Sequence, residues 1–120
     1  MPGVATVLLS DPDDRSRVVL ASLLEALGHR VVHEPGLEQV AAAVIEPASP
    51  AARRMVRLLR SDSPVPVVCV SNRRRSAAAV RLDPVAFIAK PARVGPFVRA
   101  VTTAIERSAH SAAEPARAAA

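Results

Sequence analysis

Five short, largely apolar runs divide the chain, and most of their ends are marked by Pro, Gly, Ser or charged residues. Runs of this length between such breakers are typical of buried β-strands. The predicted strands are Val4–Leu9, Arg30–His33, Ala42–Ile45, Val65–Val70 and Val85–Ala89. Because these runs are apolar almost throughout, they favour strands that are covered on both faces of a sheet.

Between the runs, apolar residues recur three or four positions apart, which predicts amphipathic helices. The clearest examples end before Gly28, fill Ala51–Arg60 and begin near Pro96. Arg73–Arg81 is predicted as a short polar helix, whereas Leu37–Ala41 leaves room for barely one helical turn. Strands that alternate with helices predict an α/β fold with a parallel sheet.

The length of 120 residues is sufficient for one domain. We assign residues 1–107 to this domain and predict that residues 108–120, which are mostly Ala with Ser, His, Glu, Pro and Arg and show no periodicity, form a disordered tail. The chain contains neither a membrane-length apolar stretch nor a signal-peptide pattern, so we expect a soluble, cytoplasmic protein without membrane association. The single Cys69 lies within a strand and is expected to be an inert buried thiol.

Lys90 is the only lysine, since the other fifteen basic residues are arginine. It follows the fifth predicted strand and precedes Pro91, and α/β proteins keep their sites at the carboxyl ends of strands. An ammonium on a flexible stem is suited to reaching a buried anionic group. Taken alone, however, a single lysine among sixteen basic residues is explained equally well by chance.

The order of the elements and several short segments resemble the receiver domain of bacterial response regulators, from Val4 to about Arg107. The segments that carry the resemblance are Val7–Asp11, Leu23–Val31, Pro50 four residues after Glu46, Pro66–Ser71 and Phe87–Pro91. The resemblance implies a flavodoxin-like, three-layer (βα)5 fold. Its five-stranded parallel sheet would have the order 2-1-3-4-5, with the site at the carboxyl ends of the strands. This sequence departs from the family in its second helix, which is expected to be shortened.

Receiver domains accept a phosphoryl group on an aspartate with the help of Mg²⁺. The resemblance places Asp11 at the first metal-binding acid, Glu46 at the phospho-acceptor, and Ser71 and Lys90 at the residues that bind phosphoryl oxygens. Phe87 takes the position of the switch aromatic. Pro12 stands at the second metal-binding acid.

Two of these positions depart from the family pattern. Pro12 supplies no side-chain oxygen, whereas Mg²⁺ demands near-octahedral oxygen ligation. Glu46 is longer than aspartate by one methylene, which displaces the carboxylate, and in-line transfer depends on positioning. We therefore predict a degenerate pocket without metal, cofactor or enzymatic activity. If Mg²⁺ binding survives, Asp11 and Asp13 are its candidate ligands, although capping of the first helix is the favoured role of Asp13.

Without a phosphoryl group, Lys90 needs another anion. We predict an ion pair between Lys90 and either Glu46 or Asp11, with Ser71 nearby. Two simpler interpretations remain: Ser71 caps the following helix, or Glu46 is a solvated carboxylate without a partner.

The expected function is that of an atypical pseudo-receiver in signal transduction or transcriptional control, which acts through phosphorylation-independent protein–protein contact. The family's usual dimerisation surface corresponds to Arg73–Arg81, Val85–Ala89 and Val94–Arg107, and would bind a protein partner or a second copy. The candidate contact residues on this surface are Arg73, Arg74, Arg81, Phe97 and Arg99.

Two alternatives belong to other functional classes. The chain could be a working phospho-acceptor of a phosphorelay with a degenerate metal site. It could also be a small basic nucleic-acid-binding module, since its net charge is +5. We disfavour direct nucleic-acid binding because no aromatic residues interleave the arginines to stack on bases.

Overall fold

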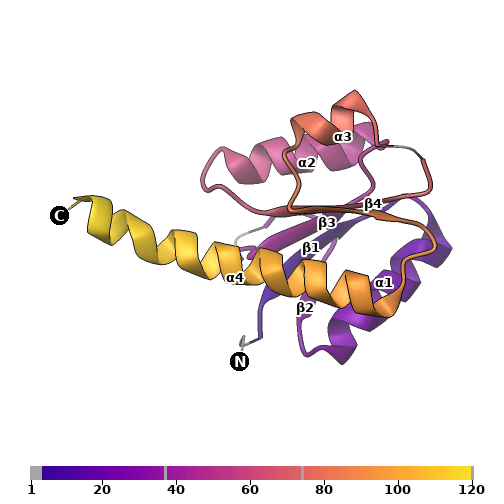
Figure 1. Cartoon of the computed structure of the whole chain (residues 1–120), viewed down its shortest axis with the longest axis horizontal. Helices are drawn as coiled ribbons and strands as arrows, with labels where there is room; N and C mark the ends of the chain where they lie inside the picture. Colours follow the sequence, from indigo (N-terminus) through magenta and orange to yellow (C-terminus); the bar gives the residue numbers. More distant parts are fainter. Residues whose placement is uncertain (1–3, 37, 74, 120) are drawn as a thin grey trace.

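The structure is a computed structural model that describes residues 4–36, 38–73 and 75–119. Its five strands form one parallel sheet in the order β2-β1-β3-β4-β5, as predicted (Figure 1). The strands are β1 (Thr6–Ser10), β2 (Arg30–Val32), β3 (Ala42–Ile45), β4 (Val67–Ser71) and β5 (Ala86–Ala89). Every residue of β3 and β4 is buried, which explains why these strands are apolar without alternation.

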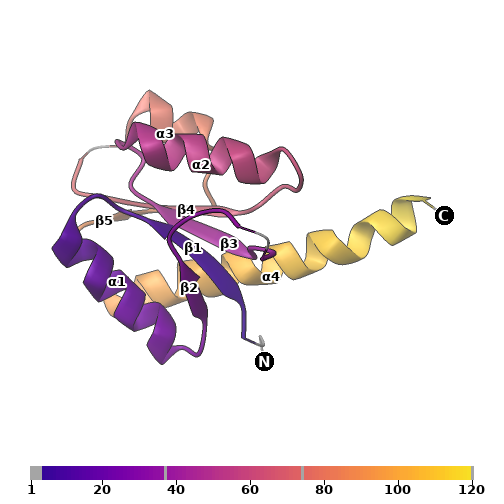
Figure 2. The ribbon, with the colours of Figure 1, turned by 180° about the vertical axis from the view of Figure 1, so that it is seen from behind.

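Helices cover both faces of the sheet. They are α1 (Asp14–Ala26), α2 (Pro50–Arg60), α3 (Ala77–Arg81) and α4 (Val94–Ala119). α1 and α4 lie on one face, and α2 and α3 lie side by side on the other (Figures 1 and 2). Each layer has its own core, one around Leu24 and Phe97 and the other around Ala52, Val56 and Leu82.

The predicted turn of helix at Leu37–Ala41 is not present in the part of this segment that the structure describes. Residues 33–36 and 38–41 are not helical, and Leu37 lies outside the described residues. The cause is the cost of helix nucleation, because a segment this short that follows Pro35-Gly36 forms too few hydrogen bonds to offset it. Val40 nevertheless covers the sheet here, as it is buried in the core beneath α2.

Capping residues set where the helices begin. Asp13 caps α1 by accepting hydrogen bonds from the backbone N–H groups of Arg15 and Ser16. Ser49 caps α2 in the same way. The helix predicted at Arg73–Arg81 begins only at Ala77, because Ser76 is its cap.

The last helix is longer than predicted. It begins at Val94 and continues to Ala119, through the segment that was expected to be a disordered tail. Alanine has the highest helix propensity, so this Ala-rich segment continues the helix without an apolar stripe. The last buried core residue of α4, among those whose side chains are described, is Ile105, so the extension lies beyond the packed core.

Within the described residues, none of the helices combines the length and the apolar character that a membrane span requires.

Candidate functional site

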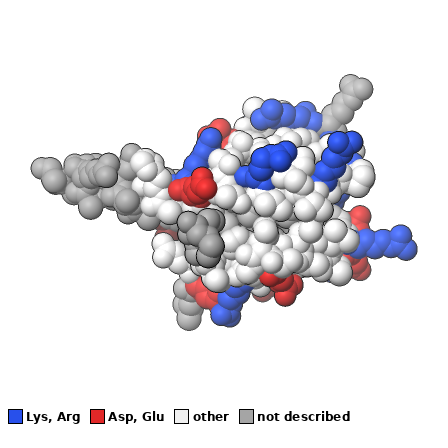
Figure 3. All heavy atoms as spheres, turned by 60° about the horizontal axis from the view of Figure 1, so that its bottom comes forward, with Lys and Arg blue, Asp and Glu red and all other residues white. Residues whose placement is uncertain are grey.

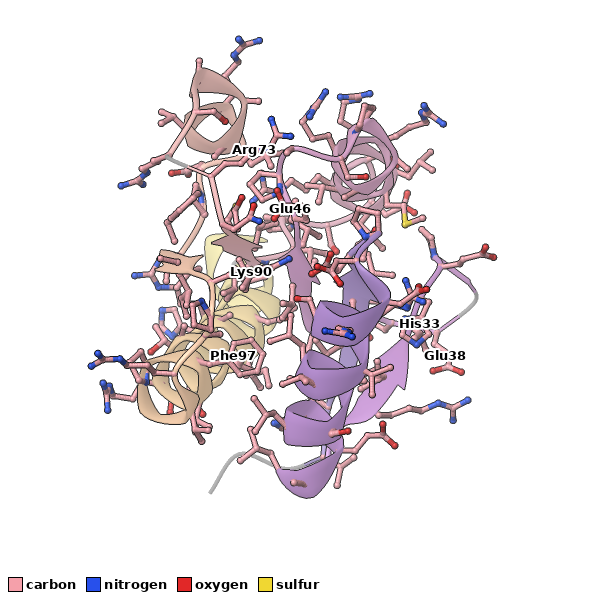
Figure 4. All side chains as sticks on the ribbon, turned by 90° about the vertical axis from the view of Figure 1, so that its right-hand side faces the viewer. His33, Glu38, Glu46, Arg73, Lys90 and Phe97 are labelled. Atoms are coloured by element: carbon pink, nitrogen blue, oxygen red, sulfur yellow. The ribbon has the colours of Figure 1, made fainter. Side chains whose placement is uncertain are left out.

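The four predicted pocket residues converge at the carboxyl edge of the sheet. Asp11 follows β1, Glu46 follows β3, Ser71 ends β4 and Lys90 follows β5. Neighbouring parallel strands end at the same edge, so residues far apart in the sequence become neighbours there. Figure 4 looks onto this edge and shows Glu46 and Lys90 close together.

Asp11 is the most completely enclosed acid of the pocket, with a side chain 2% exposed. Its Oδ2 accepts hydrogen bonds from Lys90 Nζ at 2.7 Å and from the hydroxyl of Ser16 at 2.7 Å. Its Oδ1 accepts a third from the backbone N–H of Asp13 at 2.9 Å. Burial by itself would raise the pKa of Asp11, but the hydrogen bonds from Lys90, Asp13 and Ser16 outweigh it and hold the pKa below its ordinary value. Asp11 is therefore a carboxylate at neutral pH.

Glu46 is also buried, with a side chain 8% exposed. Its Oε1 accepts hydrogen bonds from the Ser71 hydroxyl at 2.8 Å and from the backbone N–H of Ala48 at 3.3 Å. Its Oε2 accepts no hydrogen bond from the described residues and lies 3.8 Å from Lys90 Nζ. The interpretation of Glu46 as a solvated carboxylate without a partner is therefore wrong.

Lys90 links the two carboxylates. The ion pair predicted with either Glu46 or Asp11 is present with both, and the contact with Asp11 is the shorter. Ser71 combines two contacts, because its Oγ donates to Glu46 and accepts from the backbone N–H of Arg73 at 3.1 Å. It is not the cap of α3.

The donor atoms of this pocket do not fit Mg²⁺. Three of the four carboxylate oxygens of Asp11 and Glu46 accept hydrogen bonds, and the fourth faces the Lys90 ammonium. Asp13 is exposed, and its carboxylate caps α1 instead of joining Asp11. Within the described parts of the chain, no three His, Cys, Asp or Glu side chains are grouped so that they could hold a metal ion. A hydrated cation with a demand for oxygen ligands would have to displace Lys90.

Sequence reasoning missed two residues that support Asp11. Ser16 binds its carboxylate, and the guanidinium of Arg17 donates to its backbone carbonyl at 2.9 Å. Both lie in the first turn of α1, so the recognition of Asp13 as the helix cap could have placed them beside the end of β1. Cys69 on β4 is buried in the core beneath α2 and α3, and burial, followed by the nearby Glu46 charge, raises its pKa to about 11. This thiol is not a nucleophile at neutral pH.

The two phenylalanines have different environments. Phe87 on β5 is half-buried and packs against the core beneath α2 and α3. Phe97, predicted as a contact residue, is fully buried between α4 and the sheet, so that prediction is wrong. It belongs to the apolar stripe of α4, and burial of that stripe is what attaches the helix to the sheet.

The arginines predicted for the contact surface are exposed where the structure describes them. Arg73 precedes α3, Arg81 ends it, and Arg99 lies on α4. Arg74 lies outside the described residues.

Comparison with solved structures identifies the architecture. The receiver domain of a modulated diguanylate cyclase from Desulfovibrio desulfuricans G20 matches with a TM-score of 0.71 and 19% identity, over 88% of this chain and 97% of that one. A response-regulator receiver protein from Pseudoalteromonas atlantica matches with a TM-score of 0.70 and 17% identity, over 86% and 98% of the two chains. This chain has the receiver-domain fold.

A third match is a receiver domain whose structure contains a bound metal ion. The receiver domain of the sensor histidine kinase PA1611 from Pseudomonas aeruginosa PAO1 has a magnesium ion coordinated in its active-site cleft. It matches with a TM-score of 0.70 and 17% identity, over 87% of this chain and 99% of that one. No protein-family model matches the sequence, and no curated protein does so either. These likenesses, at 17–19% identity, establish the fold alone.

Proposed function

We propose that this chain is an atypical receiver-type signalling module that acts through protein contacts and does not depend on phosphorylation. The observation that supports this most strongly is that Lys90 and Ser71 already have partners within the chain. These stand where receiver domains bind phosphoryl oxygens, and here they bind the chain's own Asp11 and Glu46 at 2.7 and 2.8 Å. The Lys90 ammonium and the Ser71 hydroxyl, which an incoming phosphoryl group would need, are therefore already bound to carboxylates of the chain.

The nucleophile position supports the same proposal. Glu46 Oε1 already accepts two hydrogen bonds, and Oε2 lies against an ammonium that lowers its nucleophilicity. Phosphoryl transfer depends on positioning and on neutralisation of charge, which metal ions ordinarily supply. Pro12 supplies no carboxylate at the position where the family has its second metal-binding acid.

The internal ion pair also fixes the relation between strands. Lys90 follows the edge strand β5, whereas Asp11 follows β1, so the contact connects strands that are separated in the sheet by β3 and β4. Lys90 thereby connects the chain segments that follow β1, β3 and β5. We infer that the module is held in one conformation, with its signal carried by its surface.

Self-association would use the edge formed by α3, β5 and α4. β5 is an edge strand of the sheet, so one side of it is available for a neighbour. A hollow of about 350 Å³ lies between β5 and α4, and Phe87 and Arg99 are among its lining residues. Charge reversal at Arg99 tests this surface.

Incubation of the purified protein with acetyl phosphate and Mg²⁺, followed by intact-mass measurement, tests the proposal. We expect no phosphoryl adduct. An ordinary receiver domain serves as the positive control, and the Pro12→Asp/Glu46→Asp double variant tests whether these two positions account for the loss. A stoichiometric adduct on the wild-type chain would show that it is a working phospho-acceptor.

A further inference from the structure

Charge is distributed unevenly between the two helical layers. The segment that builds α2, β4 and α3, residues 50–82, contains eight of the sixteen basic residues but only one of the eleven acidic residues, Asp62. The rest of the chain therefore has eight basic and ten acidic residues and carries no positive excess. Figure 3 brings the bottom of Figure 1 forward: acidic and basic side chains are interspersed in the lower part of this view, whereas basic side chains gather in its upper part. The positive charge of the protein thus belongs to one layer, which we call the α2–α3 layer.

Two arginines of this layer have structural roles. Arg53 donates to the carbonyl of Pro47 at 2.8 Å. Arg60 donates to the carbonyl of Val65 at 3.1 Å and also to that of Leu82, so it connects α2 to the start of β4 and the end of α3. These contacts account for the conformation of both side chains without any partner.

The other described arginines of the layer have no such role. Their side chains are exposed and form neither an ion pair nor a hydrogen bond with any described residue. They are Arg54, Arg57, Arg73, Arg75 and Arg81. In Figure 4, nitrogen-tipped side chains of α2 and α3 point away from the sheet at the top of the view. Five exposed guanidinium groups that form no ion pair with the described residues make a surface that is complementary to a polyanion.

Exposed apolar side chains lie on the same two helices. Leu58 on α2 is 59% exposed, and Val80 on α3 is 56% exposed. Protein interfaces combine arginine with apolar contacts, whereas the backbone of a nucleic acid offers nothing for Leu or Val to bind. Both phenylalanines of the chain lie outside residues 50–82, and there is no Tyr or Trp, so the layer has no platform for base stacking. These features favour an acidic protein over a nucleic acid.

We propose that the α2–α3 layer binds an acidic segment of a partner protein that also carries apolar residues. Carboxylates of the partner pair with the exposed arginines, whose planar fork suits bidentate binding, while its apolar side chains contact Leu58 and Val80. This proposal shares one assumption with the proposed function, namely that the partner is a protein.

Fluorescence anisotropy with two labelled synthetic peptides of equal charge tests this surface. In one peptide Leu recurs at helical spacing among Glu residues, and in the other Ser replaces Leu. We expect the Leu/Glu peptide to bind and the Ser/Glu peptide to bind about tenfold more weakly, a difference of about 1.4 kcal/mol. The Arg54→Glu/Arg57→Glu variant should weaken binding of the Leu/Glu peptide by about tenfold or more.

Matched variants distinguish the effect of this surface on peptide binding from the effect of net charge. Arg15→Glu/Arg93→Glu changes the net charge equally but reverses exposed residues outside the layer, so it should retain most of the binding. Leu58→Ser should weaken binding of the Leu/Glu peptide and leave binding of the Ser/Glu peptide unchanged. All of these positions are exposed, and circular dichroism melts will check that each variant is folded.

Three results would overturn the proposal. They are absence of binding, equal weakening by both charge-reversal pairs, and tighter binding of a DNA duplex than of the Leu/Glu peptide. The assay contains no phosphodonor, so its failure leaves phosphorylation independence standing. A phosphoryl adduct, in turn, would contradict the proposed function without affecting this surface.

Discussion

Lys90→Met removes the ammonium from the pocket but retains an unbranched stem of similar length. At an effective dielectric of about 20, a unit charge pair at the observed 2.7 Å is worth about 6 kcal/mol, and one at 3.8 Å about 4 kcal/mol, before desolvation. Desolvation of the ions costs several kcal/mol each and offsets most of this attraction, so the net contribution of the ion pairs to stability is far smaller. In the variant, the buried carboxylates of Asp11 and Glu46 lose the cation that they share. We expect a loss of about 2–4 kcal/mol in the free energy of unfolding at neutral pH.

The pH dependence identifies the cause of this loss. In the wild-type protein the pKa of Asp11 lies below its ordinary value of 3.8, so its stabilising contribution is complete above that value and disappears as pH falls through the folded pKa. In the variant, burial is no longer opposed by Lys90, and the pKa of at least one carboxyl rises above its unfolded value. The penalty is therefore largest at neutral pH and decreases as pH falls through the raised pKa.

Urea denaturation followed by circular dichroism at about pH 7 and about pH 4.5 measures both effects. The stability gap between wild type and Lys90→Met should be smaller at the lower pH. Arg93→Met is the control, since Arg93 is exposed and its side chain has no partner among the described residues. A gap below about 0.5 kcal/mol at neutral pH, or one that does not change with pH, would refute the assignment of Lys90 as the stabilising cation.

Two further predictions concern the predicted contact residues. Phe97→Ala should destabilise the fold by about 3–5 kcal/mol, because it empties a fully buried site, and Phe87→Ala should cost less, since Phe87 is half-buried. Equal losses in thermal or urea denaturation would show that Phe97 is not a core residue. Arg99→Glu should shift any dimer toward monomer in size-exclusion chromatography, with Arg15→Glu as the control. A dimer that is unaffected by the change would place self-association elsewhere.

The strands of the sheet could be predicted because each is recognisable from a short segment of the sequence. Each strand contains a short apolar run, most run ends are marked by breakers, and the resemblance supplied the strand order that the structure confirms. The positions of Asp11, Glu46, Ser71 and Lys90 follow from the same property, since each lies at or just past a strand end.

What could not be predicted depends on packing or on the competition between local structures. Lys90 approaches Asp11 more closely than Glu46, and this preference depends on side-chain conformations that the sequence pattern does not contain. The apolar stripe of α4 shows that Phe97 lies on one face, but only packing shows that this face is against the sheet. The extension of α4 to Ala119 reflects helix propensity without an amphipathic signal.

The most direct test of the central claim is a Mg²⁺ titration of the ¹⁵N-labelled protein followed by two-dimensional NMR. If Lys90 and the pocket hydrogen bonds already satisfy the carboxylates of Asp11 and Glu46, the backbone amides beside these two residues and Ser71 will show no saturable shift. Saturable shifts confined to these amides would contradict the account, because they would show that the pocket still accepts the metal that phosphoryl transfer requires.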